Sequence, residues 1–191
     1  MIRIVASDPT AAELQAVLSH PEAFFEVVDG EIVEKPKMSV FSQLVARRLY
    51  KLMDEVATAG RSGTVVHEWM FAIDADRPLK RRPDIAFVSY ERWPADREVP
   101  EQGDWEVVPD LAIEVISPRD LSGEVALKIR EYLRYGVKQV WVVHPESRAI
   151  TVHYTSPRRI EEFEEGDILE GGPILPGLRI TVGDLFRRTV G

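Results

Sequence analysis

Two carboxylates and one lysine stand out in this sequence because of the apolar segments around them. Asp84 opens the apolar run 85–88, and Glu114 lies inside the apolar run 111–116. An ionised carboxylate in a buried strand is costly unless it pairs with a cation or binds a metal ion. Two carboxylates on neighbouring strands can hold one divalent cation such as Mg²⁺, and Lys128, further along the chain, could orient or deprotonate an attacking water.

Two strands are expected to carry the carboxylates. Residues 83–88 begin with a proline, which fits the first position of a strand. Residues 109–116 are almost continuously apolar, as in a central strand, and Ser117-Pro118 ends the run. The strand predicted over residues 139–143 is also strongly apolar, and a crossover connection is expected between these last two strands.

A helix over about residues 122–135 is expected to form that crossover and to position Lys128. Ser122 is its predicted cap, and Gly136 ends it. Lys128 borders the predicted buried stripe, so we expect its ammonium to face Glu114 rather than open solvent. The apolar residues of that stripe repeat at helical spacing: Leu121, Val125, Ile129, Tyr132 and Leu133.

The rest of the chain contains alternating helix and strand patterns without an internal repeat or linker. An Asp29-Gly30 turn between β-rich runs indicates a hairpin, and residues 89–108 are expected to be a long polar connection. The other predicted elements are helices over 8–18 and 41–57, strands over 64–73, 148–154 and 160–164, and a short terminal helix starting at Thr181 or Asp184. One α/β domain over residues 1–191 is the simplest prediction.

Composition limits the classes of function. The chain has 191 residues, no cysteine and a net charge of −8, so a metal ion would need carboxylate, carbonyl, histidine or water ligands. The acidic balance disfavours non-specific coating of nucleic acid. No run of residues is apolar enough to span a membrane, and no signal peptide is recognisable, so a cytoplasmic location is expected.

One compact basic run precedes Asp84. Lys80, Arg81 and Arg82 are consecutive in the sequence, and such a run serves equally well as a solvated strand entry or as a contact to nucleic-acid phosphates. The sequence leaves both interpretations open.

Several motifs together resemble the PD-(D/E)xK nuclease superfamily, and within it the Uma-type family of bacterial putative restriction endonucleases. The resemblance extends over nearly the whole chain in the family's order. It rests on the segments 25–34, 82–88, 114–118, 128–132, 136–145 and 175–180.

The resemblance implies a restriction-endonuclease-like core, a mixed β-sheet flanked by helices, here with an N-terminal helix and hairpin. It implies Mg²⁺, for which Mn²⁺ can substitute, held by Asp84, Glu114 and the backbone carbonyl of Ile116. Lys128 on the following helix would replace the lysine that such families often place two positions after the second carboxylate. Glu34 could reach the metal through water. A histidine frequent in the family near the start of the first long helix is replaced here by Phe41 or Ser42.

Structural alternatives exist for each residue and for the function. Asp84 could cap a turn, Glu114 could form a structural ion pair with Lys128, and Lys128 could be a solvated helix residue. The leading hypothesis is an Mg²⁺-dependent endonuclease acting on DNA. The alternative is an inactive, dimeric binding module that keeps the nuclease fold, with the strand predicted over residues 139–143 as a two-fold interface. An RNA substrate is not distinguished from DNA by the sequence.

Overall fold

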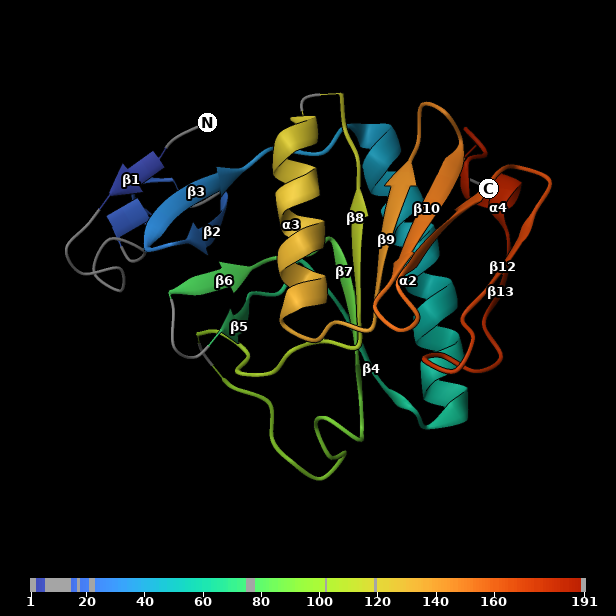
Figure 1. Ribbon diagram of the computed structural model, residues 1–191, viewed down its shortest axis with the longest axis horizontal. Helices are drawn as coiled ribbons and strands as arrows, with labels where there is room; N and C mark the ends of the chain where they lie inside the picture. Colours follow the sequence, from blue (N-terminus) through green and yellow to red (C-terminus); the bar gives the residue numbers. More distant parts are fainter. Residues whose placement is uncertain are drawn as a thin grey trace.

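The computed structural model describes residues 3–5, 15–16, 18–20, 23–74, 78–101, 103–118 and 120–189. The described strands form a large sheet, a small sheet and a separate two-stranded pair, with helices on both faces of the large sheet (Figure 1). The predicted mixed sheet flanked by helices is therefore confirmed. Most of the helix predicted over residues 8–18 lies outside the described residues, although residues 15–16 and 18–19 are helical.

Six strands make up the large sheet. In spatial order they are β11 (Arg159–Phe163), β10 (Ala149–Tyr154), β9 (Gln139–His144), β8 (Leu111–Val115), β7 (Ile85–Ser89) and β4 (Gly63–His67). The central pair β8 and β9 is parallel, and the other neighbours are antiparallel. Helix α3 (Ser122–Arg134) connects β8 to β9, which is the predicted crossover.

Five strands make up the small sheet, which lies alongside α3 (Figure 1). Its order is β1 (Arg3–Val5), β3 (Glu31–Lys35), β2 (Phe24–Val28), β6 (Leu79–Arg81) and β5 (Phe71–Asp74). The predicted hairpin is β2 and β3, joined at Asp29 and Gly30, which both have positive φ. The remaining elements are α2 (Val40–Gly60), α4 (Val182–Leu185) and the pair β12 (Ile168–Glu170) and β13 (Arg179–Thr181).

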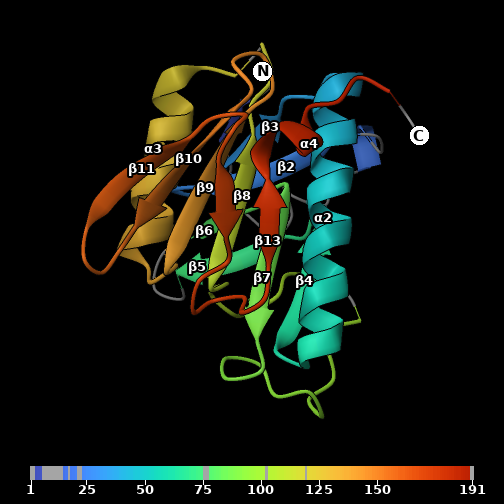
Figure 2. The same ribbon diagram turned by 90° about the vertical axis from the view of Figure 1, so that its right-hand side faces the viewer.

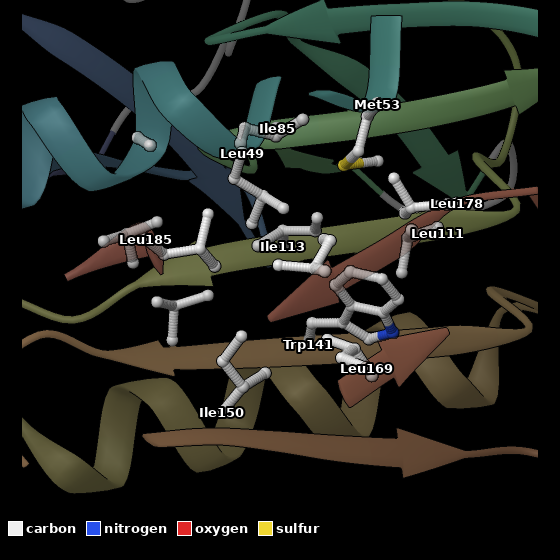
Figure 3. Packing of buried hydrophobic residues seen from close by; sticks show 14 of the residues in the cluster. Leu49, Met53, Ile85, Leu111, Ile113, Trp141, Ile150, Leu169, Leu178 and Leu185 are labelled. Carbon is white, nitrogen blue, oxygen red and sulfur yellow. The ribbon is translucent and has the colours of Figure 1, made fainter. Parts of the chain in front are cut away.

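The two faces of the large sheet pack against different helices, α3 on one side and α2 on the other (Figure 2). Successive side chains of a strand point to opposite faces. In β8, Ile113 and its neighbours at spacing two join the core beneath α2, whereas Ala112 joins the core beneath α3. Figure 3 shows the α2 side, where Leu49 and Met53 pack with Ile113 and Trp141. Glu114, one residue from Ile113, therefore points to the α3 face.

The structure corrects one strand prediction and one interface prediction. The strand predicted over residues 64–73 is instead two strands in different sheets, β4 and β5, and the chain turns between them at Glu68, which has φ of +53°. Residues 139–143 belong to β9, which is buried between β8 and β10. This strand cannot form the exposed two-fold interface expected from the sequence, so a homodimer through another surface stays a prediction.

The start of α3 also differs from the prediction. Its N-cap is Leu121, which makes no capping hydrogen bond through its side chain, and Ser122 is the first helical residue. Leu121 is 59% exposed and does not belong to the buried stripe. Nearby, the carboxylate of Asp120 accepts a hydrogen bond from the backbone amide of Ser117.

None of the described helices is both long and apolar enough to cross a membrane.

Candidate active site

Asp84 and Glu114 approach each other at one end of the large sheet. Asp84 directly precedes β7, and Glu114 lies in the adjacent antiparallel strand β8, one residue after the partner of Ile85. Both are buried, with 3% and 5% of their surfaces exposed. Together with Ile116 and Lys128 they line a cavity of about 40 Å³, enough for one or two water-sized groups.

Asp84 is held by one cation and one backbone amide. Its Oδ1 lies 2.5 Å from Nζ of Lys35, and its Oδ2 accepts a hydrogen bond from the amide of Val115, also at 2.5 Å. The same ammonium donates to Glu68 Oε2 at 2.9 Å and to the carbonyl of Arg82 at 3.0 Å. Burial by itself would lower the pKa of Lys35, but the neighbouring carboxylates raise it above its ordinary value. Lys35 is therefore a fixed positive charge beside Asp84.

Glu114 is held less strongly. The hydroxyl of Tyr132 donates to its Oε1 at 2.9 Å, and Nζ of Lys128 lies 3.2 Å from its Oε2. Burial is the largest effect, and together with the nearby Asp84 charge it raises the pKa of Glu114 to about 7 against the opposing effect of Lys128. Without an additional cation, this carboxyl is only partly ionised at neutral pH, so it has capacity for a further positive ligand.

Lys128 bridges two acids. Its ammonium lies 2.9 Å from Glu26 Oε1 and 3.2 Å from Glu114 Oε2, and its side chain is only 13% exposed. Burial lowers the pKa of Lys128, but Glu114 and Glu26 overcome this effect and raise it. The side chain is thus an ammonium at neutral pH, able to donate hydrogen bonds. This placement excludes the solvated alternative and shows the expected approach to Glu114.

A second buried cation extends the network. Arg81 pairs with Glu26 at 2.8 Å and with Glu131, and its side chain is 4% exposed. Burial raises the pKa of Glu26, but Lys128, Arg81 and Lys35 lower it to about 2, so this acid stays ionised.

The network contains more negative than positive charge. Its ion pairs join five carboxylates to three cations: Glu26, Glu68, Asp84, Glu114 and Glu131 with Lys35, Arg81 and Lys128. With every carboxyl ionised, two negative charges are in excess. Counting the nearby guanidinium of Arg82, which donates to the carbonyls of Glu68 and Phe25, still leaves one. A divalent cation would compensate this excess.

The basic run before Asp84 makes contacts within the protein. Arg81 is buried and its guanidinium is engaged by carboxylates, so the phosphate contact that the sequence left open is not available to this residue. Lys80 pairs with Asp104 at 2.7 Å. Arg82 directs its guanidinium to main-chain carbonyls and lies over the ring of Phe24.

Of two further predicted residues, Ile116 lines the cavity and Glu34 does not. The carbonyl of Ile116 accepts a hydrogen bond of 3.3 Å from Ser42 Oγ, so a residue at the family's frequent histidine position contacts this expected ligand group. Glu34 borders a neighbouring hollow of about 290 Å³ that Lys128 also lines.

The residues of the cavity fit a magnesium ion. Mg²⁺ prefers oxygen ligands and is often bound by only one or two carboxylates together with water and substrate phosphate. Among the residues described, no three histidine or acidic side chains converge on a single point. Asp84 and Glu114, the carbonyl of Ile116 and the excess negative charge match a site of the two-carboxylate type.

The sequence interpretation missed Lys35, Glu26 and Tyr132. Glu26 lies between Phe25 and Val27 in an apolar run, which is the same signal that singled out Glu114. Lys35 ends the hairpin directly before Pro36 and carried no comparable signal. Tyr132 was assigned to the buried stripe of α3, but its hydroxyl also serves as the donor to Glu114.

The mixed sheet with a helix on each face and acids at the ends of adjacent strands is the restriction-endonuclease-like nuclease fold. A crystal structure of a putative nuclease of the DUF820 family from Anabaena variabilis has the same fold, with a TM-score of 0.71 and 21% sequence identity. The similarity covers 85% of this chain and 89% of the other.

The family follows from the sequence comparison. Residues 11–183 match the model of the Uma2 family, described as putative restriction endonucleases, and the chain belongs to that family. No curated protein is significantly similar to the chain.

Proposed function

We propose that this protein is an Mg²⁺-dependent endonuclease that hydrolyses phosphodiester bonds in DNA. The residues proposed to hold the ion are Asp84, Glu114 and Ile116, the last through its backbone carbonyl, and Mn²⁺ would substitute. The observation that carries the proposal is the pair of buried carboxylates in one cavity, within a network that has negative charge in excess. Membership in Uma2 and the nuclease fold support the reaction class.

The bound ion would acidify a coordinated water and offset charge on the phosphate. Side chains of the protein would position the water and the phosphate. Lys128 keeps its proton at neutral pH, because neighbouring carboxylates raise its pKa. It therefore positions the attacking water or a phosphate oxygen by donating a hydrogen bond, and does not act as the general base.

The positions of the acids are fixed by their partners. Lys35 and the amide of Val115 hold the two oxygens of Asp84, and Tyr132 orients Glu114. Such preorganisation keeps the carboxylates in place before substrate arrives. Because the pKa of Glu114 is about 7, a proton competes with the metal ion below that pH. Cleavage should therefore rise as pH increases through 7.

The proposal is tested by cleavage of single-stranded oligonucleotides, plasmid and linear duplex DNA in Mg²⁺ or Mn²⁺. We expect Asp84→Asn and Glu114→Gln to lose activity by at least about 100-fold, in the range typical of lost electrostatic catalysis. The exposed Glu164 offers a matched control, since Glu164→Gln makes the same chemical change far from the cavity and should leave the rate unchanged. A wild-type rate no higher than that of Asp84→Asn would refute the proposed activity.

Calorimetric titration with Mn²⁺ separates the metal site from the choice of substrate. Wild-type protein should bind the ion, and Glu114→Gln should bind it at least about tenfold more weakly, because removal of one charged ligand removes a large share of the affinity. Equal binding by both proteins would place the ion elsewhere. Cleavage of RNA with no cleavage of DNA would keep the metal site and overturn the DNA assignment.

A further inference from the structure

A second, larger groove opens directly onto the candidate site. It has a volume of about 820 Å³ and runs between α2 and the strands β3 and β4. Asp84 and Lys35 line both this groove and the small cavity, so the two adjoin at these side chains. A molecule lying in the groove would therefore meet the proposed metal ligands at its inner end.

Three exposed cations border the groove: Lys37, Arg47 and Lys51. Arg47 and Lys51 are four residues apart on α2, about one helical turn or 6 Å along its axis, a separation comparable to that of successive phosphates along a strand. None of the three side chains makes an ion pair or hydrogen bond with the described part of the chain. This is notable in a protein of net charge −8, whose buried cations all pair with acids.

Aromatic side chains line the same groove. Phe24 is 46% exposed there, although it is a large apolar residue. Tyr50 and His67 contact each other edge to face, with their ring centroids 5.3 Å apart, and both also line the groove. Sites that bind single-stranded nucleic acid combine cations along the phosphate backbone with aromatic rings on which the bases stack.

We infer that this groove binds a single strand of nucleic acid, with bases on Phe24, Tyr50 or His67 and phosphates on Lys37, Arg47 and Lys51, and leads the scissile phosphate to Asp84. The inference rests on the proposed nuclease function. In a duplex the bases stack on each other and are not available to protein rings. The groove, at about 820 Å³, has the volume of a small-molecule pocket. It can therefore enclose nucleotides of one strand but not a double helix.

The test is fluorescence anisotropy in EDTA with a labelled 12-nucleotide oligothymidine and a labelled 12-base-pair duplex. Wild-type protein should bind the single strand at least about tenfold more tightly than the duplex. Phe24→Ala should weaken binding of the single strand about fivefold or more, the lower end of the loss expected for one stacked base. Binding of the duplex as tightly as the single strand would overturn the inference.

The contribution of Arg47 and Lys51 is measured separately, by the salt dependence of single-strand binding. Each phosphate contact to a single strand contributes about 0.7 to the slope of log K against log salt concentration. The double variant Arg47→Ala/Lys51→Ala should therefore lower that slope by about 1.4. Arg158→Ala removes an exposed cation in the turn between β10 and β11, at the opposite edge of the sheet, and should leave it unchanged. An unchanged slope in the double variant would overturn the inference.

Two further outcomes separate this inference from the proposed function. Wild-type protein that binds the single strand through the groove but never cleaves nucleic acid would refute the nuclease and leave the groove assignment intact. Full cleavage activity in the groove variants would refute the groove assignment and leave the nuclease intact. If wild-type protein is a dimer in sedimentation velocity and the double variant a monomer, the groove holds a second copy of the chain and the inference is wrong.

Discussion

Replacing Glu114 by glutamine should stabilise the metal-free protein at alkaline pH. The native carboxyl is buried, and its pKa is raised from 4.5 to about 7. Glutamine has the same shape, keeps an oxygen that can accept the hydrogen bond from Tyr132, and carries no charge. Lys128 loses one partner in this variant but retains its pair with Glu26. The substitution therefore removes an incompletely compensated buried charge.

The magnitude follows from the pKa. Between pH 4.5 and 7 the native protein holds a proton on Glu114 that the unfolded chain has released, so stability falls as pH rises through this interval. Above pH 7 the full cost is present. An increase from 4.5 to about 7 corresponds to about 3 kcal/mol, and the amide avoids this cost at every pH.

Urea unfolding of both proteins in EDTA, at pH 4.5 and at pH 8.5, measures the effect. The free energy of unfolding of Glu114→Gln relative to wild type should increase by about 3 kcal/mol between the two pH values. Saturating Mn²⁺ should stabilise wild type more than the variant at pH 8.5, because the ion compensates the charge that glutamine lacks. A difference between the proteins that is independent of pH would refute the reasoning.

Three other substitutions test the network and the core. Lys128→Met should lower the single-turnover cleavage rate at least about 100-fold while calorimetry shows Mn²⁺ binding retained, because the lysine acts on the substrate and not as a ligand. Lys35→Met leaves Asp84 and Glu68 without their shared cation, so urea unfolding in EDTA should show a loss of about 3–5 kcal/mol that Mn²⁺ partly restores. Leu49→Ala opens a cavity beneath α2 and should cost about 2–5 kcal/mol in the same assay, while Mn²⁺ affinity stays unchanged.

Local patterns predicted most of the fold. The Asp29-Gly30 turn defined the hairpin, and apolar periodicity defined α2, α3 and the central strands β8 and β9. The break at Glu68 was not predictable, because residues 64–73 keep a strand-like composition on both sides of it. What separates β4 from β5 is pairing with different sheets, which is a tertiary effect that overrides local preference.

The candidate site was predictable only in part for a similar reason. Asp84 and Glu114 are marked by charge within apolar runs, and Lys128 by its place on the helix. Lys35 enters the site because the small sheet packs beside the large one, and no spacing in the sequence relates it to Asp84, 49 residues away. The sequence left the role of the basic run open, because composition does not reveal that Arg81 is buried and paired with acids.

The candidate site is assembled from both sheets, since Asp84 and Glu114 come from the large sheet and its margin, whereas Glu26 and Lys35 come from the hairpin. The hairpin therefore supplies one cation and one acid of the charge network, and the site is incomplete without it. A shortened protein beginning at α2 would keep the large sheet but would leave Asp84 and Glu68 without Lys35, one of the three cations of the network. Any engineered version of this fold should therefore keep the hairpin and the central strands together.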